Sequence, residues 1–446
     1  MPFIPHTPEE VREMLAVVKV RAIGDLFAPI PEALRAKPLD LPQGMTEDAV
    51  CARFEELAAP PGRLTSFLGA GYYAHVIPKA VDALAGRSEF VTSYTPYQAE
   101  CSQGTLQAIF EYQTAVCRLF GMDCANASVY DGGTALFEAA MMALRATRRS
   151  RIIVDECVNP QWRRMLATYT AGLDVELRTV PHAQGRCDVN ALAEVIDEKC
   201  AAVLVQQPTF FGTIEDYEAL FAKAHDKGAL GVVSVYPVLQ AVLKTPGETG
   251  ADIAVAEGQS LGLPLSFGGP YLGIMTCRKA LVRQLPGRIV GRTEDREGRP
   301  AYVLTLQARE QHIRRAKATS NICSNQALCA LRALIHLSLL GPKGLAAAAA
   351  RSMELARSVA EWATALPGVK RHNDAPFGNE VALKFPIPAR TVVEMAAAHG
   401  VVPGYPVGDR YPGLEDVLLV ACTEANTDKD VERLVRTLAN ILGGRS

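Results

Sequence analysis

The chain has 446 residues, of which 49% are hydrophobic and 21% are charged. This balance is ordinary for a folded globular protein, and it excludes a disordered chain, a coiled coil and a collagen-like repeat. The 46 basic and 48 acidic side chains give a net charge of −2. Since nucleic-acid binders carry a basic excess or a basic stripe, we expect no nucleic-acid partner.

We also expect no membrane span, no secretory signal and no metal site. No uncharged apolar run reaches about eighteen residues, and Glu9, Glu10 and Glu13 stand where a signal would be apolar. The eleven cysteines form no C-x-x-C pair and no zinc-like spacing with histidine. Scattered cysteines of this kind predict reduced thiols and a cytoplasmic location, with Cys101 and Cys323 as buried packing residues.

Residues 1–62 are predicted to form an N-terminal helical and extended arm. Thr7 as N-cap and Pro8 at the first helical position begin a helix that runs to about Val20. A proline-punctuated extended stretch follows, and a second helix spans about 47–59. Such an arm cannot bury its apolar residues alone, so we expect it to pack on a larger body or on a partner subunit.

Residues 63–330 are predicted to form a large α/β domain, because helical periods alternate with short β-branched runs. This alternation indicates βαβ units and a mainly parallel sheet. We expect residues 331–446 to form a smaller C-terminal α+β domain within a region that is helical from about 309. The expected strands are 151–154, 175–179, 201–205, 230–235, 253–257, 272–276, 381–385 and 417–420; the expected helices are 103–120, one ending near 145, 160–170, 190–198, 217–227, one ending near 365 and one from about 428.

Three segments carry patterns typical of binding sites. Gly132, Gly133 and Thr134 precede a helix, where free backbone N–H groups can hold a phosphate, although a capped turn is the alternative. Segment 93–100 gathers two tyrosines, a glutamine and a glutamate around a proline. Such loops orient small charged substrates, or simply lead into a helix. Residues 259–270 form a glycine-rich link between two predicted buried strands.

Together these segments resemble the glycine cleavage system P-protein family, the glycine decarboxylases, and more narrowly the N-terminal or alpha subunit of its two-subunit bacterial form. The resemblance implies a fold-type-I aminotransferase-like architecture, with a seven-stranded, mostly parallel sheet and a smaller C-terminal domain. The matching pieces are IGDLF-APIP (23–31), SFLGAGYYAHVIP (66–78), SYTPYQAECSQG (93–104), NASVYDGGTALFEAA (126–140), GADIAVAEGQSLGLPLSFGGPYLG (250–273) and RRAKATSNIC (314–323).

The family's catalytic half implies a lysine that binds pyridoxal phosphate five residues before Pro264, and this chain has Gln259 there. A glutamine amide is not a nucleophilic amine, so it cannot bind the cofactor covalently. The carboxylate implied beside the pyridine nitrogen is also missing, since strand 230–235 ends in Ser234-Val235. No other lysine has a suitable context, and Asn159 stands where the family commonly has a histidine. The chain therefore resembles a non-catalytic paralogue with a vestigial pocket at Gly132, Gly133, Thr134 and Gln259.

The resemblance implies a supporting subunit of glycine dehydrogenase (aminomethyl-transferring), inactive when isolated. A beta-type partner, in an α2β2 assembly, would hold the pyridoxal phosphate, decarboxylate glycine and pass the aminomethyl group to the lipoyl arm of H-protein. Two alternatives remain open: a self-sufficient enzyme using another lysine, and a structural protein with a dead pocket. The residues lent to the partner's site would be Tyr94, Thr95, Tyr97, Gln98 and Glu100, with Thr319, Ser320 and Asn321 contacting the phosphate in trans.

Overall fold

The computed structural model describes residues 5–37, 40–58 and 64–443, and the chain divides into one unit at 1–62 and another at 63–446. The first unit holds helices α1 (Pro8–Val17) and α2 (Glu47–Ala58). Thr7 caps α1 as predicted, because its hydroxyl accepts the N–H of Glu10 and the Glu10 carboxylate accepts the N–H of Thr7.

The prediction of an extended stretch after α1 is wrong at Ile23–Phe27, which forms a 3-10 helix. The Asp25 carboxylate accepts the N–H groups of Arg21 and Ala22, and these bonds hold the chain in a turn. Helix α1 also ends three residues before the predicted Val20, at Val17.

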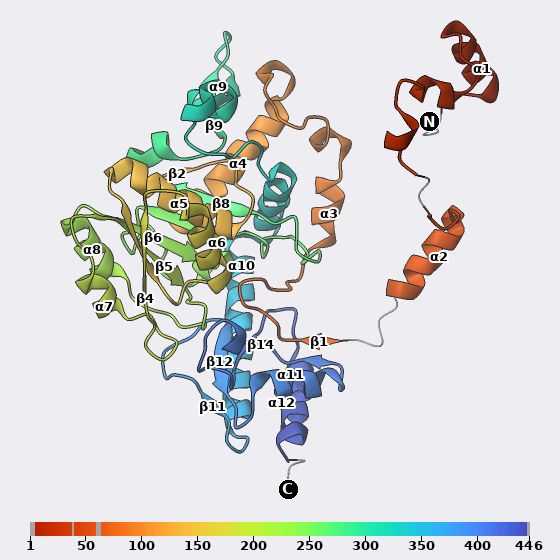
Figure 1. Cartoon of the computed structure of the whole chain (residues 1–446). Helices are drawn as coiled ribbons and strands as arrows, with labels where there is room; N and C mark the ends of the chain where they lie inside the picture. Colours follow the sequence, from red (N-terminus) through yellow and green to blue (C-terminus); the bar gives the residue numbers. More distant parts are fainter. Residues whose placement is uncertain (1–4, 38–39, 59–63, 444–446) are drawn as a thin grey trace. The chain divides into compact units, whose positions relative to one another are not determined.

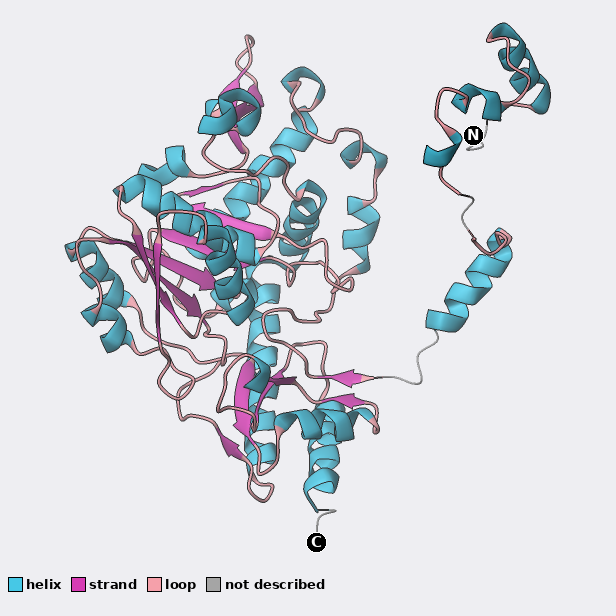
Figure 2. Ribbon diagram, viewed as in Figure 1, coloured by secondary structure: helices cyan, strands magenta, loops and turns pink. Residues whose placement is uncertain are grey.

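A seven-stranded sheet is the centre of the second unit, as predicted (Figures 1 and 2). Five neighbouring strands run parallel, and β8 is antiparallel to β7 and to β2. In spatial order the strands are β2 (Cys124–Ala125), β8 (Gly273–Cys277), β7 (Ile253–Glu257), β6 (Leu230–Val235), β5 (Cys200–Gln207), β3 (Arg151–Asp155) and β4 (Glu176–Val180).

Both faces of this sheet are buried except at its edge strand β4, and this burial explains the continuous apolar runs of the inner strands. Successive residues of β3 enter different hydrophobic clusters, with Ile153 in one and Ile152 and Val154 in the other. Helices α4 and α8 contribute to the first cluster, and α5 and α6 to the second. The helices of this part are α3 (Lys79–Ala85), α4 (Gln103–Phe120), α5 (Gly132–Thr147), α6 (Pro160–Thr170), α7 (Val189–Glu194) and α8 (Glu218–Asp226).

Two expectations for this part need correction. Helix α7 ends at Glu194 rather than near 198, where the Asp197 carboxylate accepts the N–H of Lys199 and forms a turn instead. The sequence analysis also missed a hairpin formed by β9 (Ile289–Glu294) and β10 (Pro300–Thr305). Its tip is charged and its strands mix polar with apolar residues, so no regular hydrophobic pattern marks it.

The helical region predicted from about 309 begins only at Ala327. Before it lie short turns and α9 (Gln311–Arg314), because Arg315 adopts a φ of 55°, which ends the helix. Helix α10 (Ala327–Thr364) is bent at Gly341, where φ is 59° and ψ is −176°, just before Pro342.

Helix α10 is long and apolar enough to cross a membrane, judged by length and composition alone. Its first half, however, packs Ala330 and Ala333 into a cluster on the central sheet. Its second half packs Leu355 and Val359 against the C-terminal strands. These contacts make it a core helix within the described part of the chain.

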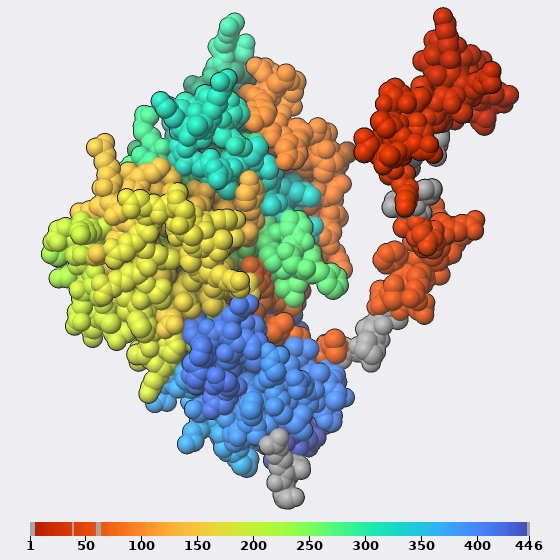
Figure 3. Space-filling model, viewed as in Figure 1, coloured from red at the N-terminus to blue at the C-terminus, as the bar shows by residue number. Residues whose placement is uncertain are grey.

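An antiparallel four-stranded sheet forms the C-terminal region, coloured blue in Figure 3. Near it, β1 (Thr65–Ser66) pairs in parallel with β13 (Val401–Val402). This pairing starts the segment that leads from the C-terminal region back to the central sheet. The remaining elements are β11 (Lys370–Arg371), β12 (Glu380–Lys384), β15 (Val417–Ala421), β14 (Tyr405–Pro406), α11 (Ala389–Ala397) and α12 (Asp428–Gly443).

Candidate functional site

Gln259, at the position of the implied lysine, is buried, and its side-chain amide is hydrogen-bonded to backbone groups. Its Oε1 accepts the N–H of Tyr73 at 3.0 Å, and its Nε2 donates to the carbonyls of Tyr73 at 3.0 Å and Leu263 at 2.9 Å. The side chain is 1% exposed, so these bonds replace all contact with water. Gln259 thus fastens the segment around Tyr73 to the carboxyl end of the central sheet.

Glu257 occupies the N-terminus of α5, the place at which sequence patterns predicted a phosphate. It is the last residue of β7, and its Oε2 accepts the N–H of Gly132 at 2.9 Å. Its Oε1 accepts the N–H groups of Gln259 at 3.0 Å and Leu272 at 3.2 Å. Burial raises the pKa of Glu257 to about 7, although these three bonds favour the charged form. A carboxylate of this chain therefore takes the position of an external anion.

The glycines of this turn are needed for packing against Trp162 of α6. A Cβ on Gly132 would lie 2.9 Å from the Trp162 ring and from Glu257, and one on Gly133 would lie 3.0 Å from the same ring. The next N–H, that of Thr134, donates to the Asp131 carboxylate at 2.8 Å. The N–H groups of the turn are thus bonded to carboxylates of the chain itself, and the Trp162 indole packs over the two glycines.

The residues present do not fit pyridoxal phosphate. The space remaining beside Trp162, Glu257 and Tyr236 has a volume of about 30 Å³, room for on the order of one or two water molecules. Ser234, at the position of the implied carboxylate, is 1% exposed, and its hydroxyl has no partner among the described residues. Within the described part of the chain, no lysine lines this space. The cofactor's three requirements, an amine, a carboxylate and an open phosphate position, are all unmet.

The segment around Tyr73 closes the pocket from the C-terminal side. The Tyr73 hydroxyl donates to the Glu380 carboxylate at 2.8 Å, and its ring lies 4.6 Å from that of Tyr236. Tyr236 in turn hydrogen-bonds His75, whose other ring nitrogen lies 2.8 Å from Glu424. Burial raises the pKa of Glu380 to about 7. This polar network joins the seven-stranded sheet to the four-stranded sheet. Tyr73, Tyr236 and Glu380 also line the 30 Å³ space, which we call the filled pocket.

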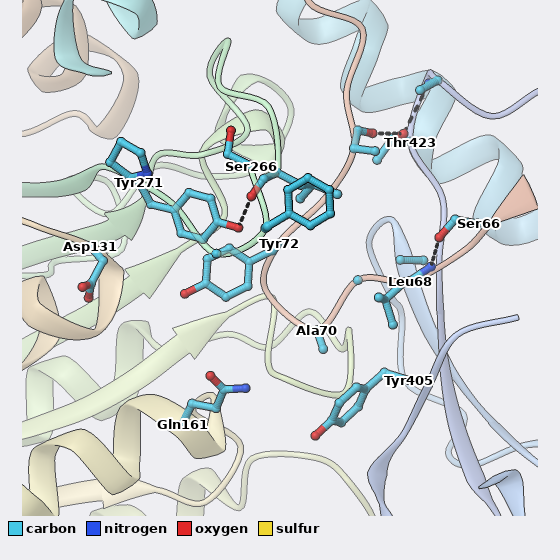
Figure 4. Close-up of a pocket in the computed structure, with 18 of the residues that line it drawn as sticks. Ser66, Leu68, Ala70, Tyr72, Asp131, Gln161, Ser266, Tyr271, Tyr405 and Thr423 are labelled. Carbon is cyan, nitrogen blue, oxygen red and sulfur yellow. Dashed lines mark hydrogen bonds between the residues drawn. The ribbon is translucent and has the colours of Figure 1, made fainter. Parts of the chain in front are cut away.

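A larger cleft of about 990 Å³ lies next to the filled pocket (Figure 4). The rings of Tyr72 and Tyr271 stack at 4.8 Å on one side, and Gln161 and Tyr405 line another. Phe267, on the glycine-rich loop that also lines the cleft, is fully exposed. Among the residues that the structure describes, no lysine lines this cleft either.

The residues predicted to be lent to a partner lie elsewhere, on exposed loops. Tyr94 is 84% exposed and Tyr97 is 52% exposed, and Gln98 and Glu100 are exposed as well, whereas Thr95 is half-buried. The structure brings Tyr97 close to the loop that follows Thr319, through Arg288. It brings none of these side chains into the filled pocket.

The three residues predicted to contact a phosphate in trans differ in their surroundings. The Ser320 hydroxyl donates to Glu138 at 2.6 Å, and the N–H of Thr319 donates to the carbonyl of Arg309 at 3.1 Å. Asn321 is exposed. Hydrogen bonds to Glu138 and Arg309 therefore hold the loop against the rest of the domain, while Asn321 is exposed to solvent.

The prediction that Cys101 and Cys323 are buried packing residues is wrong, because both are exposed on these two loops. Sequence reasoning also missed Glu257, Trp162 and Arg288. An acid at the end of the apolar run 253–257 was a usable signal for Glu257. Nothing local distinguished Trp162 or Arg288.

Comparison with known proteins identifies the family of this chain. Residues 1–438 match the model of a family described as glycine cleavage system P-protein. A relative from Desulfovibrio desulfuricans, named "Probable glycine dehydrogenase (decarboxylating) subunit 1", is 66% identical over 443 residues, which cover 99% of this chain and 100% of the relative. The chain belongs to the glycine cleavage system P-protein family. The resemblance seen in the sequence is thus confirmed.

Other P-protein relatives support the fold. A protein of the same name from Geotalea daltonii is 50% identical over 98% of this chain and 99% of its own length. A crystal structure of glycine decarboxylase (P-protein) in inhibitor-bound form superposes with a TM-score of 0.91 at 44% identity, covering 99% of this chain and 100% of that one. The cysteine desulfurase CsdA of Escherichia coli, at 16% identity and a TM-score of 0.63 over 88% of this chain and 98% of its own, shares the fold alone. The predicted fold-type-I architecture is confirmed.

Proposed function

We propose that this chain is the non-lysine-bearing subunit of a two-subunit glycine decarboxylase. With a beta-type partner that holds pyridoxal phosphate, it decarboxylates glycine and transfers the aminomethyl group to the lipoyl arm of H-protein. The relatives named as subunit 1 support a second subunit. An α2β2 assembly and a cytoplasmic location belong to the same proposal.

One observation carries this proposal: Glu257 fills the anion position at the N-terminus of α5, while Gln259 stands at the lysine position. Neither feature suits a bound cofactor, which supports the placement of pyridoxal phosphate in the partner. No lysine lines either cavity described above, which argues against a self-sufficient enzyme. A purely structural protein would have no use for the exposed, polar loop around Tyr97.

In this proposal two loops of the chain complete the partner's active site. The first carries Tyr94, Thr95, Tyr97, Gln98 and Glu100, whose hydroxyl, amide and carboxylate groups suit the orientation of a small zwitterion. The second carries Thr319, Ser320 and Asn321 as phosphate contacts in trans. Thr95, Thr319 and Ser320 are half-buried, but the other five side chains are exposed, which supports the proposal, because a side chain that is to be lent must face outward.

The N-terminal arm is proposed to bind the same partner. Neither α1 nor α2 has a buried residue, and large apolar side chains such as Val17, Leu34 and Phe54 are exposed. Exposed apolar residues in this number mark an interaction surface.

The test is glycine–bicarbonate exchange by each subunit alone and by the two together. We expect exchange only from the reconstituted pair, with spectroscopically detectable cofactor in the partner alone. Exchange by this chain without a partner would refute the proposal. Full exchange by the partner alone would show that the lent loops have no catalytic role.

A further inference from the structure

Arg288 connects the two loops that are proposed to be lent. Its Nη1 donates to the Asn325 amide oxygen at 2.9 Å, and its Nη2 donates to the Cys323 carbonyl at 3.0 Å. The same Nη2 lies 3.4 Å from the Tyr97 hydroxyl, and the guanidinium is 5.6 Å from the centre of the Tyr97 ring. One side chain thus contacts loop 93–100 and loop 319–325 at once.

The burial of this guanidinium is unusual for a charge. Arg288 is 4% exposed, its hydrogen-bond partners among the described residues are all neutral, and its Nε has no hydrogen-bond partner. Burying a cation without an anion costs folding free energy, because the charge loses its hydration and gains no ion pair. Such a cation is retained where its hydrogen bonds serve another purpose.

The contacts of Arg288 depend on the planar fork of its guanidinium. Both Nη1 and Nη2 donate to loop 319–325, and Nη2 also reaches the Tyr97 hydroxyl while the guanidinium carbon lies over the Tyr97 ring, an arrangement that a lysine cannot reproduce. Asn325 continues the arrangement, because its own Nδ2 donates to the carbonyl of Ala127 at 2.8 Å. The second loop is thereby anchored to the central domain.

We infer that Arg288 is a positioning residue, which fixes Tyr97 relative to loop 319–325 so that both meet one active site of the partner. This inference rests on the proposed function. It assigns to Arg288 no contact with substrate or cofactor. Its effect is exerted through the tyrosine hydroxyl and through the backbone at Cys323.

The first experiment uses the isolated full-length chain and does not require activity. Amide hydrogen exchange is compared in wild type, Arg288→Lys and Arg149→Lys. Arg149 is a matched control, because its guanidinium likewise joins two separate segments, through the backbone carbonyls of Cys200 and Lys227, which lie far along the chain from both loops. We expect faster exchange in residues 95–102 and 320–326 only in Arg288→Lys. Unchanged exchange in either segment would overturn the inference even if the proposed function holds.

The second experiment uses the reconstituted two-subunit complex and measures kcat and KM for glycine in the exchange reaction. We expect Arg288→Lys to lower kcat about tenfold with little change in KM, since a displaced contact acts on the reacting geometry. Arg149→Lys should keep the wild-type kcat. Full kcat in Arg288→Lys would overturn the inference. An inactive wild-type complex would instead refute the proposed function, and amide hydrogen exchange would then test whether Arg288 holds the two loops together.

A double-variant cycle separates positioning from general damage. Tyr97→Phe and Arg288→Lys should not be additive, because both disturb the same hydroxyl. We expect the double variant to be no slower than the slower single variant within about twofold. Multiplied losses would show that the two residues act independently and would contradict the inference.

Discussion

The side chain of Gln259 and the backbone of Tyr73 form two reciprocal hydrogen bonds, each 3.0 Å long. The amide thus pairs with the peptide backbone much as a neighbouring strand would. A lysine could donate to the Tyr73 carbonyl but could not accept its N–H. The position to which the sequence resemblance assigns a lysine is therefore occupied here by a glutamine that acts as a structural clamp.

Gln259→Ala should destabilise the chain strongly while leaving its chemistry intact. Three buried backbone groups would lose their partners, and we expect a loss of about 2–4 kcal/mol in the free energy of unfolding, measured in urea. Gln107→Ala, on the exposed face of α4, is the control and should change stability by less than about 0.5 kcal/mol. Exchange activity per assembled complex should stay within about twofold of wild type. Unaltered stability would contradict the clamp.

Restoring the missing functional groups should not restore cofactor binding. In Gln259→Lys, and in Gln259→Lys combined with Ser234→Asp, the Glu257 carboxylate and the Trp162 ring still fill the pocket. We expect no visible absorbance after incubation with pyridoxal phosphate and none that borohydride removes. A stoichiometric borohydride-sensitive band in either variant would show that the pocket opens.

Tyr97→Phe tests the lent loop with the smallest change available. Losing one hydroxyl hydrogen bond, about 0.5–1.5 kcal/mol, should lower turnover by the reconstituted complex roughly two- to tenfold if the bond acts in the transition state. Tyr169→Phe is a matched control, since Tyr169 is also 52% exposed but lies on α6 against Phe137. Gel filtration checks assembly of both variants. Equal turnover in the two variants would exclude a role for the Tyr97 hydroxyl.

Glu380 should make stability fall as pH rises. Burial raises its pKa to about 7 in the folded chain, whereas an unfolded glutamate titrates near about 4.3. Between these values the folded chain keeps a proton that the unfolded chain releases, so stability present below the unfolded pKa is lost as the pH rises through the folded pKa. We expect this group to cost about 2–3 kcal/mol between pH 5 and pH 8.

Glu380→Gln isolates this effect, because its amide can still accept the N–H of Ala70 and donate to the Tyr73 hydroxyl. Other shifted groups, such as Glu257 and His336, are common to both proteins and cancel in the comparison. Urea unfolding at several pH values should give a clearly shallower pH dependence in Glu380→Gln. Parallel curves would show that Glu380 does not titrate with the raised pKa.

Removal of residues 1–62 should spare the fold of the remaining chain and weaken assembly. The described helices of the arm have no buried residue, so circular dichroism of residues 63–446 should match the expected helix and strand content. Pull-down of the partner subunit should fall at least tenfold. Wild-type assembly without the arm would remove it from the proposed interface.

Much of the fold was predictable because its signals are local. Helix α6 has its predicted bounds since Asn159 caps it and Pro160 starts it, and strands β6 and β7 match because they are short apolar runs between turns. The filled pocket was not predictable, because the bond from Gly132 to Glu257 joins residues 125 positions apart. The hairpin of β9 and β10 was missed since cross-strand pairing stabilises it more than any hydrophobic period does.

The carboxylate at the N-terminus of α5 also changes how this subunit responds to its surroundings. A protein that binds a ligand only when folded gains stability with the ligand's concentration, and loses it when the ligand is scarce. Here strand β7 supplies the anion from within the same molecule, at an effective concentration that never varies. Under the proposed function, folding of this subunit does not depend on the supply of pyridoxal phosphate, and its melting temperature should be the same with and without the added cofactor.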